Sequence, residues 1–496
     1  MGNLNLASSR IRILTIFILA FFLLFAARLI QIQAVQAGEY RNKAVNEMES
    51  TRAIPAARGE ITDINGVAFA RSVSAINIVV DQTQVTDAAQ TANFAAPYLG
   101  MTVAQVQSAI SGTKRYSMVA KSAKPAVWRN LTAAIESYNA ALAKEHFDKR
   151  IVGFFAERNY IREYPSGSLV SSLVGFVRQD GIGATGIESS MNSKITGTDG
   201  RYSYARGLGA EIPGSQNELV AAKKGTTIRL TIDRDVQWVA ANAIQEAVSK
   251  ARAVSGTVIV MDPKTGHILA HATAPTFDPN NTKTVSESLM RNPSVQDIYE
   301  PGSTGKVMTL AAALEEKKIT PETVLSVPYS IKRGGEVFHD HERHPVQKLT
   351  TSGILAVSSN TGTIKIGEML SNDTLHDYLS KFGMGKSTGS GLPGESAGIL
   401  RPVSDWSGTT APTVAFGQGY SLTAMQATSI FATIANDGVR VSPTVIAGTS
   451  DPSGKFTASS ARSNERVISA TTAKQLRIMM ESVVSGQGTA PSAAIP

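Results

Sequence analysis

The segment that decides the fold of the second half of the chain is Glu300-Pro301-Gly302-Ser303-Thr304-Gly305-Lys306, followed by the apolar run Val307–Leu314. Proline and glycine before a serine, with an apolar helical run after it, place Ser303 at the amino terminus of a helix. Exposed backbone N–H groups and the helix dipole favour negative charge there. Ser303 and Lys306 are three positions apart, so their side chains lie on one face of the first turn.

This spacing is suited to nucleophilic catalysis. A serine hydroxyl is a weak nucleophile alone, and a lysine can act as its base when burial or another cation lowers the lysine pKa. The alternative is a helix cap followed by a surface lysine. A second element, Val357-Ser358-Ser359-Asn360-Thr361, favours catalysis because it supplies S-x-N fifty-five residues after Ser303. We expect Ser358 to relay a proton to the leaving group and the Asn360 amide to hold a substrate carbonyl.

The order S-x-x-K, S-x-N, K-T-G is typical of serine-acylating enzymes that recognise penicillin. Over nearly its whole length the chain resembles the class B penicillin-binding proteins. The resemblance is carried in the first half by Arg58-Gly59-Glu60-Ile61-Thr62-Asp63, Arg162-Glu163-Tyr164-Pro165-Ser166-Gly167 and Gly183-Ala184-Thr185-Gly186-Ile187-Glu188. In the second half it is carried by Leu230-Thr231-Ile232-Asp233, Pro275-Thr276-Phe277-Asp278-Pro279-Asn280, Tyr299-Glu300-Pro301-Gly302-Ser303, Phe416-Gly417-Gln418-Gly419 and Thr423-Ala424-Met425-Gln426. Ile64 and Ser172 depart from the family pattern, in which many members carry a basic residue and a histidine.

The resemblance implies an α+β protein. It has an N-terminal transmembrane helix, an elongated mixed α/β pedestal, and a penicillin-binding transpeptidase domain in which helices flank an antiparallel sheet, as in β-lactamases. We expect a cytoplasmic tail at 1–9, a transmembrane signal anchor at 10–35, a pedestal or dimerisation-type domain at 38–222, and the transpeptidase domain at 226–496.

Local patterns predict individual elements. They give a strand at Ala75–Val80, a helix at Pro125–Lys144 and a polar linker at Gly214–Gly225. The second domain then begins with a strand at Thr226–Asp233 and a helix at Val236–Ala251, followed by a hairpin whose strands Gly256–Met261 and Ile268–Thr273 flank the turn Asp262–Gly266.

The amino terminus predicts a membrane anchor. Arg10 and Arg12 precede the apolar segment Ile13–Val35, which as a helix is about 34 Å long and therefore reaches across a bilayer. Arg28 then lies near the outer boundary, where its head group can reach the interface. Basic residues on the amino-terminal side favour a cytoplasmic tail and an exported body. The alternative is a signal peptide cleaved near Ala37.

The resemblance also implies a reaction. Ser303 attacks the penultimate D-alanine carbonyl of a peptidoglycan stem peptide, Lys306 is its base, and the Ser303 N–H forms half of the oxyanion hole. An amine of a neighbouring stem then accepts the acyl group, and β-lactams block Ser303. Neither a cofactor nor a metal is expected. The implied partners are the membrane, a membrane glycosyltransferase and other division or elongation proteins, with division favoured because the pedestal has no large insertion.

The third motif is not found where the family has it. The K-T-G at Lys264-Thr265-Gly266 precedes Ser303 and belongs to the predicted hairpin, so we interpret Lys264 as a structural turn residue. The family's catalytic K-T-G follows a stretch like Gly488–Pro496. We therefore expect the transpeptidase domain to be incomplete at its carboxyl end, as a fragment of a longer protein or as a degenerate member.

Other functional classes are weighed against this one. The chain has no cysteine, which excludes disulfide scaffolds and thiolate sites, and its net charge of +8 is scattered rather than clustered for nucleic acid. His339, His341 and His344 suggest a metal-dependent hydrolase, but their surroundings look like a loop. A second alternative function is that of a non-catalytic scaffold for wall synthesis that is tethered to the membrane. A D,D-carboxypeptidase is disfavoured by the long pedestal.

Overall fold

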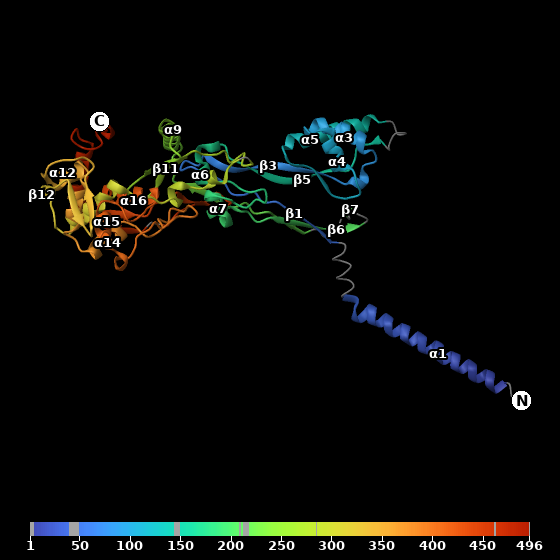
Figure 1. Ribbon diagram of the computed structural model, residues 1–496. Coiled ribbons are helices and arrows are strands. Elements are labelled where there is room, and N and C mark those ends of the chain that lie inside the picture. Colours follow the sequence, from blue (N-terminus) through green and yellow to red (C-terminus); the bar gives the residue numbers. More distant parts are fainter. Residues whose placement is uncertain are drawn as a thin grey trace. The chain divides into compact units, whose positions relative to one another are not determined.

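The computed structural model describes residues 4–38, 49–142, 149–207, 210–211, 218–283, 285–460 and 463–495. The chain divides into two compact units (Figure 1). One unit comprises Met1–Ala56 with Thr198–Lys223, and the other comprises Ala57–Gly197 with Lys224–Pro496. The domain limits expected at 38–222 and 226–496 stay predictions.

The first unit begins with the apolar helix α1 (Leu4–Ile30), which continues into one π-helical turn at Gln31–Val35. The part from Ile11 to Val35 is long and apolar enough to cross a membrane, and none of it is buried. Arg28 donates a hydrogen bond from Nη1 to Gln31 Oε1 at 2.8 Å near the end of this span. A helix with apolar side chains on all sides is stable when lipid surrounds it, so α1 is suited to membrane anchoring.

The rest of the first unit is a small antiparallel sheet. Strand β6 (Gly200–Gly207) pairs with β1 (Glu49–Ile54), β7 (Ala210–Glu211) and β8 (Glu218–Val220). The linker expected at Gly214–Gly225 is therefore wrong at 218–220, where the chain gives β6 a partner for its backbone groups. Residues 214–217 of that linker lie outside the described residues.

A seven-stranded sheet runs through the second unit and joins segments far apart in the sequence. The strand order is β18 (Phe456–Ala458), β17 (Ile446–Ser450), β9 (Thr227–Leu230), β2 (Ile61–Thr62), β3 (Ala68–Val80), β4 (Ser117–Ala123), and β5 (Phe154–Glu163) also pairs with β3. Among these strand pairs in the described part of the chain, β2 and β9 run parallel and all the others run antiparallel. The two expected domains thus share hydrogen-bonded strands at β2 and β9.

Helices cover the far half of β3. The strand expected at Ala75–Val80 is the second half of β3, and α3 (Ala88–Leu99), α4 (Val103–Ile110) and α5 (Pro125–Ala141) lie beside it (Figure 1). Its side chains Ile78 and Val80 are buried in one cluster with residues of these helices. Ile78, Val106 and Leu131 form the centre of this core. The helix predicted at Pro125–Lys144 is confirmed as far as Ala141, and residues 143–144 lie outside the described residues.

Three segments of the first half converge on one buried carboxylate. Glu188, at 0% exposure, accepts from Arg58 Nε at 2.6 Å and from Arg162 Nε at 2.7 Å. Tyr164 OH lies 3.4 Å from Glu188 Oε1, and burial together with this carboxylate raises the tyrosine pKa. The Asn280 side chain in turn bonds both Tyr164 N and Tyr164 O at 3.0 Å. This cluster fixes the first-half motifs to a loop of the second half.

The elements before the nucleophile segment match the sequence patterns. Helix α9 (Arg234–Ala251) is capped by the preceding residue Asp233, whose Oδ1 accepts the N–H groups of Asp235 and Val236. Strands β10 (Gly256–Met261) and β11 (Ile268–Ala274) form the predicted antiparallel hairpin. The side chains of β11 are almost all buried. Ala270 and Ala272 pack with Ala240 of α9, and Ile268 belongs to the neighbouring core.

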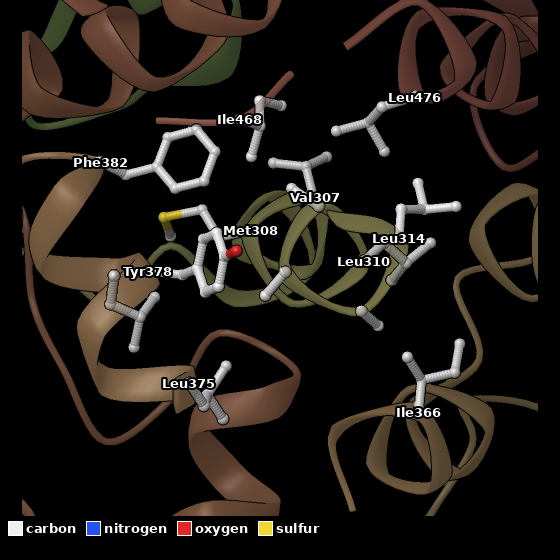
Figure 2. Packing of buried hydrophobic residues seen from close by; sticks show 14 of the residues in the cluster. Val307, Met308, Leu310, Leu314, Ile366, Leu375, Tyr378, Phe382, Ile468 and Leu476 are labelled. Carbon is white, nitrogen blue, oxygen red and sulfur yellow. The ribbon is translucent and has the colours of Figure 1, made fainter. Parts of the chain in front are cut away.

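The largest core surrounds helix α11 (Lys306–Glu315), whose residues from Lys306 to Leu314 are all buried. Figure 2 shows Met308 of α11 beside Tyr378 of α14 (Asn372–Lys381) and beside Phe382, with Leu310 and Leu314 farther along the helix. Helices α13 (Asn360–Gly367), α16 (Ala424–Ala435) and α17 (Ala470–Glu481) complete the shell. A helix held on all sides is a rigid base for the residues at its amino terminus.

Shorter elements connect these parts. They are α6 (Ser171–Val174), α7 (Gly186–Ser190), α8 (Asn192–Ile195), α10 (Pro293–Gln296), α12 (Thr351–Ala356), α15 (Thr410–Ala415), and the strands β12 (Val324–Val327), β13 (Ser330–Arg333), β14 (Glu336–His339), β15 (Gln347–Thr350), β16 (Val439–Val441) and β19 (Asn464–Arg466). The pairs β12–β15, β13–β14 and β16–β19 are antiparallel.

Candidate active site

Ser303 lies in a short 3₁₀ turn, Gly302–Gly305, directly before α11. Gly302 has φ +55°, and its N–H donates to Gly417 O at 2.8 Å. A Cβ on Gly417 would lie 1.8 Å from Gly302 O. The 416–420 loop can therefore approach the turn this closely only because residue 417 is a glycine. The prediction of Ser303 at a helix amino terminus is confirmed, with the 3₁₀ turn as the added detail.

Lys306 is the first residue of α11, and none of its surface is exposed. Its Nζ donates to Ser358 O at 2.5 Å and to Ser358 Oγ at 3.0 Å. Burial lowers the pKa of Lys306 to about 8, although the Asp340 carboxylate opposes this shift. A lysine with this pKa is partly neutral near neutral pH and can accept a proton.

Ser358 joins the lysine to the serine. Its Oγ donates to Ser303 Oγ at 2.9 Å, whereas no hydrogen bond within the described residues joins Lys306 directly to Ser303. The i, i+3 spacing had suggested that Ser303 and Lys306 interact directly, whereas in the structure Ser358 Oγ lies between them. Hydroxyl hydrogens rotate freely, so the same line of atoms can carry a proton from Ser303 toward Lys306.

Asn360 begins α13, at the end of the loop that carries Ser358. Its Nδ2 donates to the carbonyl of His339 at 3.1 Å, and the side chain also lines the cavity in front of Ser303. The four residues singled out in the sequence, Ser303, Lys306, Ser358 and Asn360, thus belong to one region.

The cavity has a volume of about 1020 Å³ and an open mouth, and Ser303 is exposed to it. Its wall consists of Ser303, Ser358 and Asn360, the loop 340–345, and the segment Gln487–Thr489. Lys264 is not among the described residues of this wall. It lies in the β10–β11 turn, where its N–H donates to Asp262 Oδ1 at 2.8 Å, as expected of a turn residue.

The sequence pattern had given Asp340 no role and had suggested His344 only as a possible metal ligand. Asp340, which is 6% exposed, accepts from Ser359 Oγ at 2.7 Å, and the ring of His344 lies 3.0 Å from the same carboxylate. The histidines of this run had suggested metal binding, whereas in the structure Asp340 is the residue that contacts both Ser359 and His344. In the part of the chain that the structure describes, no three potential ligands are gathered for a metal ion.

Comparison with known proteins places the chain in a family. The chain matches the penicillin-binding protein transpeptidase domain over residues 256–496 and the penicillin-binding protein dimerisation domain over residues 53–230. PbpB of Mycobacterium tuberculosis is 35% identical over an alignment of 495 residues, which covers 97% of this chain and 72% of that protein. Stage V sporulation protein D of Bacillus subtilis is 31% identical, over 96% of this chain and 72% of that protein.

Solved structures agree with these matches. The crystal structure of penicillin-binding protein 3 from Mycobacterium tuberculosis, complexed with aztreonam, is 32% identical and covers 90% of this chain and 80% of its own, with a TM-score of 0.68. The expected fold class, with a pedestal and a transpeptidase domain, is therefore confirmed. The chain belongs to the class B penicillin-binding proteins, a family of peptidoglycan D,D-transpeptidases.

Proposed function

We propose that this protein cross-links peptidoglycan stem peptides through an acyl-enzyme on Ser303 and that β-lactams acylate the same serine. The observation that carries the proposal is the line of polar atoms from Lys306 Nζ through Ser358 Oγ to Ser303 Oγ, with separations of 3.0 and 2.9 Å. It gives an exposed hydroxyl a buried amine as its base, at the mouth of an open cavity.

In the acylation step, Ser303 Oγ attacks the carbonyl carbon of the penultimate D-alanine. The Ser303 proton passes to Ser358 Oγ, whose own proton passes to Lys306 Nζ. The new Oγ–C bond forms a tetrahedral oxyanion, which the Ser303 N–H stabilises. The C–N bond then breaks, and the proton returns along the same line to the nitrogen of the departing D-alanine.

The transfer step reverses this order with a different amine. The amine of a neighbouring stem peptide attacks the acyl carbon and loses a proton through Ser358 to Lys306. The new amide forms as the Oγ–C bond breaks, and Ser303 recovers its proton. Asn360 is suited to orienting the acceptor or donor carbonyl, because its side chain borders the cavity beside Ser358.

The setting proposed for this reaction is the outer face of the cell membrane. Helix α1 would be the anchor, with Arg12 on the cytoplasmic side and the catalytic domain outside, and cell division would be the process served. A membrane glycosyltransferase would supply the glycan strands. Chain that stays with membranes after carbonate washing supports the anchor, whereas a soluble form starting near Gly38 contradicts it.

The test of the chemistry is acylation by a fluorescent penicillin, located by mass spectrometry of the labelled peptide. The membrane-bound chain should take up one label at Ser303, and Ser303→Ala should take up none. Thr304→Ala is a matched control, because Thr304 is the neighbouring exposed hydroxyl in the same turn. Label on another residue, or equal labelling of Ser303→Ala, would contradict the proposed nucleophile.

A further inference from the structure

A buried carboxylate lies behind the S-x-N segment. Asp340 follows strand β14, and its Oδ2 accepts from Ser359 Oγ at 2.7 Å while its Oδ1 accepts the Thr361 N–H at 2.9 Å. Thr361 Oγ1 lies 3.4 Å from Oδ2. The carboxylate therefore holds the residues on both sides of Asn360. Charge-assisted hydrogen bonds of this kind are about twice as strong as neutral ones.

His344 supports this carboxylate from the loop that follows β14. Its Nδ1 lies 2.7 Å from Pro345 O, and its Nε2 lies 3.0 Å from Asp340 Oδ2. Both neighbouring atoms are acceptors, but a neutral imidazole has only one N–H. Both contacts are hydrogen bonds when both ring nitrogens carry a proton, and the same two partners raise the pKa of His344. The side chains of the pair are only 15% and 8% exposed.

Other rings and charges surround the pair. The Tyr329 ring stacks on His339 and meets the His344 ring edge-on at 6.0 Å between centroids. The Arg343 guanidinium lies 5.9 Å from the Tyr329 centroid. The Asp340 charge also acts on the pKa of Lys306, which it raises against the larger lowering by burial. The Asp340 carboxylate thus contacts His344 and acts electrostatically on Lys306.

The residue that these contacts constrain is Ser358. It has φ +56°, a left-handed conformation that is unfavourable for any residue with a Cβ. In that conformation Ser358 presents both O and Oγ to Lys306 and its Oγ to Ser303. The next residue, Ser359, is fixed by Asp340 through its side chain and caps α13 by accepting from Gly362 N–H at 2.9 Å.

We propose that Asp340 and His344 are a positioning pair, which holds Ser358 in its left-handed conformation and so keeps Ser358 Oγ between Lys306 and Ser303. Neither residue takes part in the bonds that form or break. The inference rests on the proposed acyl transfer at Ser303. In this proposal Asp340, the acidic residue of the histidine-rich run, helps to fix the positions of the atoms that carry the proton between Ser303 and Lys306.

Asp340→Asn tests the pair, because asparagine keeps the shape but replaces one carboxylate oxygen with an NH₂ donor. It therefore cannot accept both the Thr361 N–H at one position and the Ser359 hydroxyl at the other. We expect β-lactam acylation to slow about tenfold at saturating ligand, the loss that follows from releasing one left-handed residue. The ligand concentration at half-maximal rate should change little. Asp377→Asn is the matched control, since Asp377 lies on α14 in a partly exposed pair with Lys381 and is not among the described residues of the cavity wall.

Two substitutions of His344 distinguish the effect of its hydrogen bond from the effect of its packing. His344→Gln retains a side-chain N–H for Asp340 and should acylate close to the wild-type rate. His344→Ala should be about fivefold slower, the worth of one hydrogen bond. If glutamine and alanine behave alike, or if Asp340→Asn acylates at the wild-type rate, the positioning pair is refuted.

Amide hydrogen exchange gives a readout that does not depend on acylation. In Asp340→Asn the Thr361 and Gly362 amides should exchange faster, while the amides of α11 keep their protection. This outcome supports the pair even if Ser303 proves not to be acylated, which would refute the proposed function alone. Unchanged exchange at Thr361, or equal loss of protection throughout α11, would overturn the inference.

Discussion

Lys306 Nζ lies 3.0 Å from Ser358 Oγ and 2.5 Å from Ser358 O, so one side chain both meets the hydroxyl of the S-x-N motif and supports its backbone. A neutral amine can still donate to the carbonyl while it accepts a proton from the hydroxyl. This double contact explains how a buried lysine remains in place through a cycle of proton uptake and release.

The pKa of Lys306 predicts the pH dependence of acylation. The pKa is lowered to about 8, so the neutral base is a minor form at pH 7 and the major form at pH 9. We expect the rate of β-lactam acylation to rise about tenfold between pH 7 and pH 9, as the lysine loses its proton. Stopped-flow acylation across this range measures it, and a rate that falls or stays level would contradict the assignment.

Substitution separates the two lysines that the sequence offers. Lys306→Ala should abolish measurable acylation, because the proton of Ser303 then has no acceptor. Lys264→Ala should leave the acylation rate within about twofold of wild type, because its side chain makes no hydrogen bond or ion pair within the described residues and its turn is capped through backbone N–H groups. Both variants are measured with the same labelled penicillin, and a reversed result would relocate the active site.

The close approach of Gly417 to Gly302 gives a further prediction. Gly417→Ala puts a Cβ 1.8 Å from a backbone oxygen of the nucleophile turn, so the turn must move and acylation should fall by at least about tenfold. Gly454→Ala is the control, because Gly454 has φ +90°, close to the +92° of Gly417, but open space around it. Equal acylation by the two variants would show that the contact is irrelevant.

Local patterns sufficed for the parts of the fold that neighbouring residues determine. The hairpin at Asp262–Gly266 and the helix after Ser303 follow from turn residues and apolar runs of short range. The order of S-x-x-K and S-x-N was also enough to associate Ser303 with Ser358. The shared sheet at β2 and β9 was not predictable in this way, because it joins strands more than 160 residues apart.

The residues that were missed have long-range roles. The sequence around Glu188 does not indicate that its carboxylate pairs with two arginines, which come from segments 130 and 26 residues away in the chain. Asp340 was overlooked for a related reason. Its neighbours His339 and His341 suggested a metal site, while its actual partners Ser359 and Thr361 come about 20 residues later in the chain.

The Glu188 cluster predicts a large effect on stability. Glu188→Gln leaves two arginine head groups without their buried carboxylate, and this should lower the free energy of unfolding by about 3–5 kcal/mol. Glu163→Gln is the control, because its pair with Arg71 is about half exposed and should contribute at most about 1 kcal/mol. Urea unfolding of the detergent-solubilised chain measures both. Similar losses for the two variants would refute the special role of Glu188.

His271 on β11 predicts how stability depends on pH. It is fully buried, its Nε2 lies 2.5 Å from Ser294 Oγ, and burial lowers its pKa from 6.5 to about 4. Between these values the unfolded chain binds a proton that the folded chain does not, so stability is complete above pH 6.5 and is lost as the pH falls. The expected contribution is a loss of about 2 kcal/mol between pH 6.5 and pH 5. In urea unfolding, His271→Gln should show a shallower decline over this interval than the wild type, because glutamine does not titrate. The same decline in both proteins would show that His271 is already protonated in the folded state or that other groups dominate.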